Sequence, residues 1–223
     1  GEYLKKAFEI FKKKELDQEE SYKEFLEFEF VYDYAVFISL KKANNLISWN
    51  EWPEEEKMWI IDKKLDLSPY EDQIAYEIFI QYIFYKQWMK LKSYANEKGL
   101  KIIGDIPFYV GLDSLDVWQN QKDFEITDEG KPILIAGVPP DAFSDEGQRW
   151  GNPIYRWEEL EKDDFKFWID RLAYNAKLYD IIRLDHFRAF DTYWEIEDKY
   201  DNAIIGEWKE APGYALFDKI TKE

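Results

Sequence analysis

Three residues that can take part in chemistry lie close together near the end of the chain, namely Arg183, Asp185 and His186. They end the segment 179–188, in which a helical pattern gives way to a short apolar run. Because Arg183 and Asp185 are two residues apart, their side chains leave the same face of a strand. Convergent charge at the end of a strand is typical of the catalytic edge of a barrel enzyme. An alternative interpretation is a salt bridge without a catalytic role.

A second carboxylate ends another short apolar run. The segment Lys101–Asp105 predicts a buried strand that ends on Asp105, and Ile106–Tyr109 follows it as a loop. Asp105 is therefore a second candidate site residue on a strand of its own. The alternative is that its carboxylate merely caps the loop after the strand.

Composition excludes several classes of function. The 223 residues contain no cysteine and one histidine, so a zinc site built from His and Cys ligands is nearly excluded. The net charge of −17 would repel a phosphate backbone, which argues against nucleic acid as a partner. No apolar run approaches the roughly 20 residues of a membrane span, and no signal peptide opens the chain, so we expect a cytoplasmic protein. Aromatic residues make up 19% of the chain, which suits a sugar ligand, although most of the rings are expected in the core.

Helical patterns dominate the first part of the chain. Residues 1–98 read as helices, with Ser21 and Glu24 as a capping box, a joint near Phe30 and Gly99 as the stop of the longest helix. Residues 99–223 alternate between short strands, helices and a long irregular segment over 137–153. Long irregular loops in compact domains are often functional.

Alternating strands and helices predict an α/β fold with a parallel sheet. A closed (β/α)8 barrel needs eight strands in about 250 residues, whereas this chain offers two convincing ones. We therefore expect part of a (β/α)8 TIM barrel with an inserted, mainly helical subdomain. The boundaries are 1–98 for the helical subdomain with barrel helices and 99–223 for the partial barrel.

Several motifs resemble one family, the 4-alpha-glucanotransferases or amylomaltases of the alpha-amylase clan. They occur in the family's order and at its distances, and they are Gly104-Asp105-Ile106-Pro107, Asp116-Val117-Trp118, Ala136-Gly137-Val138-Pro139-Pro140-Asp141, Gly151-Asn152-Pro153 and Arg183-Leu184-Asp185-His186-Phe187-Arg188. One departure is Ala189, where the family usually has glycine, and we expect little effect from the added methyl group.

The resemblance implies transfer of alpha-1,4-glucan segments between malto-oligosaccharides through a covalent glycosyl-enzyme, without a metal or another cofactor. It assigns the nucleophile to Asp185, and Arg183 would pair with that carboxylate and keep it ionised. Asp105 and His186 would hydrogen-bond the sugar. The loop from Gly137 to Trp150 would cover the substrate, with Trp150 as a stacking platform and Asn152 as a further sugar contact.

Retaining chemistry also needs a carboxylic acid about 5 to 5.5 Å from the nucleophile. The resemblance implies that this glutamate lies on a strand beyond Glu223, so we expect the chain to carry the nucleophile half of the site and to be inactive alone. Glu195 and Glu207 are poor substitutes, because neither lies where the family places an acid.

Other functions are also compatible with some of these residues. One is a non-catalytic carbohydrate-binding module, and another is a metal-dependent hydrolase using Asp105, Asp185 and His186, which a single histidine makes a poor candidate. Unpaired sheet edges could also lead the chain to self-associate.

Overall fold

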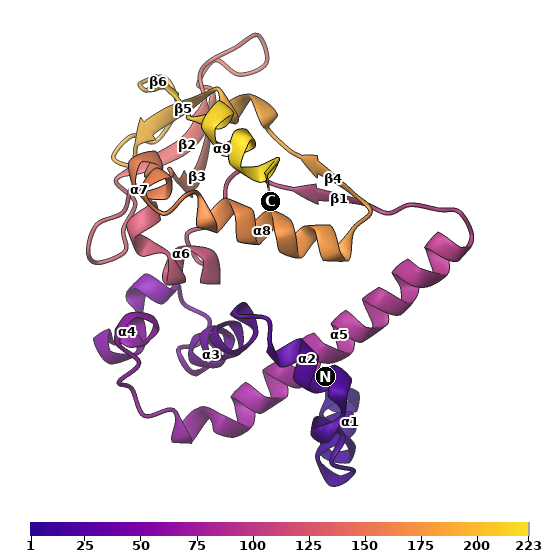
Figure 1. Ribbon diagram of the computed structural model, residues 1–223. Helices are drawn as coiled ribbons and strands as arrows, with labels where there is room; N and C mark the ends of the chain where they lie inside the picture. The colour runs from indigo at the N-terminus through magenta and orange to yellow at the C-terminus, as the bar shows by residue number, and fades with distance from the viewer. Residues whose placement is uncertain (223) are drawn as a thin grey trace. The chain divides into compact units, whose positions relative to one another are not determined.

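The computed structural model describes residues 1–222 and contains two compact units, Gly1–Gly99 and Leu100–Glu223 (Figure 1). The first unit is helical and the second mixes strands with helices, so the chain has an α/β fold.

Five α-helices make up the first unit: α1 Glu2–Lys13, α2 Glu20–Leu26, α3 Phe30–Ala43, α4 Glu54–Asp62 and α5 Glu71–Glu97. The predicted joint near Phe30 is the break between α2 and α3. Gly99 follows the end of α5 with a φ of 77°, a conformation that glycine adopts without strain, so the predicted stop is confirmed. The predicted capping box is wrong, because α2 begins one residue before Ser21 and the Ser21 hydroxyl is hydrogen-bonded to the hydroxyl of Tyr82 instead.

Aromatic rings from α1, α2 and α5 form the core of the first unit. Phe11 packs against Phe79 at 5.0 Å and against Tyr22 at 5.2 Å between ring centroids, and Tyr22 meets Tyr82 edge-on at 5.1 Å. Ring pairs at these distances stabilise the fold by more than the burial of their apolar surface alone. The aromatic stripes of these helices are therefore packing residues, as expected.

Two parallel strands, β1 Ile103–Ile106 and β4 Ile181–Leu184, position the charged residues of the second unit. Their register places Asp105 opposite Arg183. Helix α8, Lys166–Leu178, precedes β4 and runs beside the pair, which completes the predicted strand–helix–strand order (Figure 1). The prediction of a buried strand is wrong for Ile103, whose side chain is exposed, because within the described residues β1 and β4 form a sheet of only two strands.

A four-stranded antiparallel sheet lies in the same unit, in the order β3-β2-β5-β6. Its strands are β2 Leu134–Val138, β3 Gln148–Pro153, β5 Thr192–Glu197 and β6 Glu207–Glu210. The prediction that 137–153 is irregular throughout is wrong, because β2 ends and β3 forms within it. Gly137, Gly151 and Pro153 hide the strand pattern in the sequence, since glycine and proline are depleted in strands.

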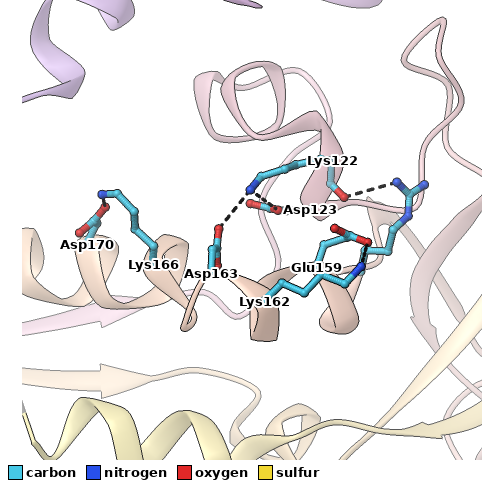
Figure 2. Close-up of polar contacts among 8 residues, drawn as sticks. Lys122, Asp123, Glu159, Lys162, Asp163, Lys166 and Asp170 are labelled. Atoms are coloured by element: carbon cyan, nitrogen blue, oxygen red, sulfur yellow. Dashed lines mark hydrogen bonds and ion pairs between the residues drawn. The ribbon is translucent and has the colours of Figure 1, made fainter.

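The second unit also contains the helices α6 Leu115–Gln119, α7 Trp157–Lys162 and α9 Gly213–Ile220. Near α7 and α8, an ion-pair network links Lys122 to Asp163 at 3.2 Å and to the buried Asp123 at 3.9 Å (Figure 2). Trp168 of α8 is fully buried and packs against the rings of Phe108 and Phe190, which follow β1 and β4 in the sequence. No helix among residues 1–222 has both the length and the apolar character needed to cross a membrane.

Candidate active site

Asp105, Arg183 and Asp185 meet at the carboxyl ends of the two parallel strands. Arg183 donates from Nη1 to Oδ2 of Asp105 at 2.5 Å and from Nη2 to Oδ1 of Asp185 at 2.8 Å. The strand register explains this arrangement, because Asp105 is level with Arg183 and Asp185 follows two residues later on the same face. Asp185 lies just beyond β4, and its backbone N–H donates to the carbonyl oxygen of Ile106 at 2.9 Å.

Both carboxylates keep access to solvent while they are held by the same guanidinium. The side chain of Asp185 is 52% exposed. Because a planar guanidinium can bind two carboxylates at once, Arg183 fixes their relative position as well as balancing part of their charge. An exposed, oriented carboxylate with a cation beside it can act as a nucleophile.

His186 follows directly and turns the chain away from the strand. Its backbone has a φ of 47°, in the left-handed region, and a short 3-10 turn, Phe187–Phe190, begins after it. The imidazole is half-buried and lies 5.0 Å from the ring of Trp150, edge to face. Burial lowers the pKa of His186, and the Arg188 charge acts in the same direction, while Asp185 opposes both. A neutral imidazole has one N–H donor and one acceptor nitrogen.

Strand β3 brings Trp150 and Asn152 to the same region. The Trp150 indole is partly exposed, and its Nε1 donates to Oε1 of Gln148 at 3.1 Å. Asn152 uses its amide nitrogen to donate to the carbonyl oxygen of Val110 at 2.9 Å. Asn152 therefore anchors the loop that follows β1, and its contact with a sugar stays a prediction.

Tyr109 is a member of this region that the sequence did not single out. Its ring lies 6.2 Å from His186 and 6.2 Å from Trp150, and its side chain is buried. Tyr109 lies three residues after the last residue of β1, Ile106, in the loop at the strand end where barrel enzymes build their sites. This position in the sequence could have indicated it.

Glu195 and Glu207 lie opposite each other on β5 and β6 of the antiparallel sheet. Lys209 Nζ lies 3.7 Å from Glu195 and 2.9 Å from Glu207. Burial raises the pKa of Glu195, with Lys209 acting against the rise. Within residues 1–222 no group of three or more His, Cys, Asp or Glu side chains is placed to hold a metal ion.

Carboxylates and aromatic rings gathered at the carboxyl ends of parallel strands are the arrangement of the α/β barrel enzymes. The chain belongs to the 4-alpha-glucanotransferase family, whose pattern matches residues 1–223.

Individual relatives agree with this family. The chain is 43% identical to a 4-alpha-glucanotransferase of Thermus thermophilus, over 97% of this chain and 44% of that protein. It is also 43% identical to the chloroplastic/amyloplastic 4-alpha-glucanotransferase of Solanum tuberosum, over 84% of this chain and 33% of that protein. A solved amylomaltase of Streptococcus agalactiae in complex with acarbose superposes with a TM-score of 0.91 at 40% identity, covering 99% of this chain and 45% of that one. The chain thus spans less than half the length of these relatives.

Proposed function

We propose that these residues carry the nucleophile of a retaining transfer of alpha-1,4-glucan segments between malto-oligosaccharides. The observation that supports this best is the ion pair between Arg183 and the exposed Asp185 at the end of a parallel strand. Family membership supplies the reaction class, and the geometry supplies a carboxylate that is both oriented and accessible.

In the first step, an oxygen of Asp185 attacks the anomeric carbon of the donor glucan. The bond between that carbon and the glycosidic oxygen breaks, and the leaving oxygen takes a proton from a second carboxylic acid. The 4-hydroxyl of an acceptor glucan then attacks the same carbon, displaces Asp185 and returns its proton to the second carboxyl group. Two displacements retain the configuration of the sugar.

The neighbouring residues have supporting roles in this proposal. Arg183 holds Asp185 in the attacking position, and Asp105 and His186 hydrogen-bond hydroxyl groups of the sugar beside it. Trp150 offers an indole face to a sugar ring, and Asn152 is a further sugar contact through its carbonyl oxygen.

The second carboxylic acid is not supplied by Glu195 or Glu207 in this proposal. Both are engaged with Lys209 on the antiparallel sheet, whereas a retaining acid must face the nucleophile at about 5 to 5.5 Å. We therefore expect the 223 residues alone to bind a glucan without transferring it.

We also propose that residues 1–98 form the inserted helical subdomain together with barrel helices, and that the protein is located in the cytoplasm. Self-association through the strand edges stays a prediction.

The test combines binding with turnover. Because His186 is the only histidine of the chain, its imidazole C–H signals in proton NMR report on the site without overlap from other histidines. Acarbose or maltotriose should shift these signals in a saturable way, and incubation with maltotriose should give no longer or shorter glucans. Absence of any shift would count against a glucan site. Rapid glucan transfer by these 223 residues would contradict the proposal that they lack the second carboxylic acid. Glucan binding without covalent chemistry at Asp185 would favour a carbohydrate-binding module.

A further inference from the structure

The His186 imidazole is surrounded by aromatic rings that come from two other parts of the second unit. We propose that Tyr109 and Trp150 are positioning residues, which hold this imidazole in one orientation and shield it from water. This proposal rests on the proposed function, in which His186 binds the sugar, and adds the residues that hold His186 in place.

Three aromatic rings lie close to the imidazole. Trp150 meets it edge to face at 5.0 Å with an interplanar angle of 78°, and Tyr109 lies at 6.2 Å with an angle of 36°. Phe108 meets it at 6.4 Å with an angle of 74°. All three separations lie in the range where aromatic rings attract one another. Three rings packed near the imidazole at different interplanar angles leave it less room to rotate about its side-chain bonds.

The loop that carries Tyr109 is itself held at both ends. Tyr155 donates its hydroxyl to the carbonyl oxygen of Phe108 at 2.6 Å, and Asn152 donates to the carbonyl oxygen of Val110 at 2.9 Å. The ring of Tyr109 also stacks on that of Tyr155 at 6.2 Å. Tyr109 is thus fixed through the residues before and after it, and it can in turn fix His186.

The charged groups near the imidazole partly oppose each other. Asp185 favours the protonated ring and Arg188 disfavours it, whereas the residues packed on it, Phe108, Tyr109 and Trp150, are uncharged. Burial raises the pKa of the Tyr109 phenol, which therefore stays neutral. The net effect on His186 is a lowered pKa caused first by burial. The aromatic enclosure thus favours a neutral ring that can both donate to and accept from sugar hydroxyls.

The experiment measures the pKa of His186 by NMR titration of the whole chain without sugar. Tyr109→Leu removes the aromatic ring from one side, and Tyr109→Phe keeps the ring and removes only the hydroxyl. We expect the pKa of His186 to rise toward the ordinary 6.5 in the Leu variant and to stay at its wild-type value in the Phe variant. Tyr200→Leu is the matched control, because Tyr200 packs against the cluster of Ile135, Ile196 and Ala203. It should leave the titration unchanged.

A second variant keeps the test valid if Tyr109→Leu fails to fold. Trp150 is 39% exposed, so Trp150→Leu should fold, and it should raise the pKa of His186 as well. An unchanged pKa in Trp150→Leu, or in a folded Tyr109→Leu, would overturn the proposal, as would an equal rise in Tyr200→Leu. Titration with maltotriose separates this inference from the proposed function. If the variants change the pKa of His186 without sugar, but maltotriose shifts none of the His186 signals, the positioning role is retained and the glucan site is rejected.

Discussion

Arg183 contacts Asp185 two residues further along the chain, and the same guanidinium contacts Asp105 on the neighbouring strand. The contact to Asp105 follows from parallel pairing in which Asp105 and Arg183 are register partners. The Arg183 side chain therefore positions the carboxylate that we propose as the nucleophile relative to both strands.

Replacing this side chain with Arg183→Lys should slow chemistry at Asp185 by about 100-fold, because an ammonium cannot hold two carboxylates in a fixed fork and small displacements of reacting groups are costly. The measurement is the rate of covalent labelling of Asp185 by a glycosyl fluoride. Arg156→Lys is the matched control, since Arg156 pairs with Glu125 elsewhere in the second unit. Equal labelling rates in wild type and Arg183→Lys would show that Arg183 does not position Asp185 for attack.

The pairing of β1 and β4 can be tested through a glycine. A Cβ added at Gly104 would lie 2.1 Å from Cδ2 of Tyr179, so Gly104→Ala must displace that ring or the strand. We expect a loss of about 1–3 kcal/mol in the free energy of unfolding, measured with urea. Gly111→Ala is the matched control, because a Cβ there meets no atom within 4 Å. Equal stability of the two variants would show that the close approach is absent.

A buried carboxylate should make stability depend on pH. Asp123 is 1% exposed, and burial raises its pKa to about 6, with Lys122 opposing and Asp163 adding to the rise. A carboxyl group whose pKa is higher in the folded state than in the unfolded state stabilises the folded protein when it is protonated. This stabilisation is lost as the pH rises through about 6. Asp123→Asn should therefore be more stable than wild type at pH 8, by on the order of 2 kcal/mol, with a smaller difference at pH 5.

The matched control for this prediction is Asp170→Asn. Asp170 pairs with Lys166 at the surface of α8, near the same network (Figure 2). Urea unfolding at both pH values should show no such change between pH 5 and pH 8 for this variant. If the stability of wild type and Asp123→Asn differs equally at the two pH values, titration of Asp123 is not the cause.

In the first unit, an ion pair joins Lys42 to the buried Glu77. Glu77 also accepts from Gln73, so Lys42→Met leaves a buried carboxylate with one partner fewer. We expect a loss of about 1–2 kcal/mol in the free energy of unfolding, because a buried carboxylate loses a charged hydrogen-bond donor whose own side chain is 44% exposed. The double variant Lys42→Met/Glu77→Gln should recover most of that loss in urea unfolding. A double variant that is as unstable as the single one would contradict this explanation.

The strands that carry Asp105 and Arg183 were predictable from the sequence, since a short apolar run ending in charge marks a strand of a parallel sheet. The end of the longest helix was also predictable, because Gly99 follows its helical pattern. The sequence indicated one arm of a hairpin at residues 133–136, which overlaps β2, but not the rest of the antiparallel sheet. Its β3 contains Gly151 and Pro153, and its β6 is polar, so neither has the alternating apolar pattern of a strand.

The role of Tyr109 was equally hidden. Its importance comes from contacts with Tyr155, Trp150 and His186, which lie 41 or more residues away along the chain. Aromatic residues are so frequent in this protein that no single ring is conspicuous in the sequence. Only the fold selects the few that surround the imidazole.

The most direct test of the proposed function is covalent labelling with α-maltosyl fluoride. Fluoride leaves with its bonding electrons and needs no proton from a carboxylic acid, so an oxygen of Asp185 can displace it even where the acid is lacking. We predict that the intact mass of the protein rises by one maltosyl unit, that peptide mapping places this unit on Asp185, and that Asp185→Asn stays unlabelled. An unlabelled wild type, or a label on any other residue, would show that Asp185 is not the nucleophile.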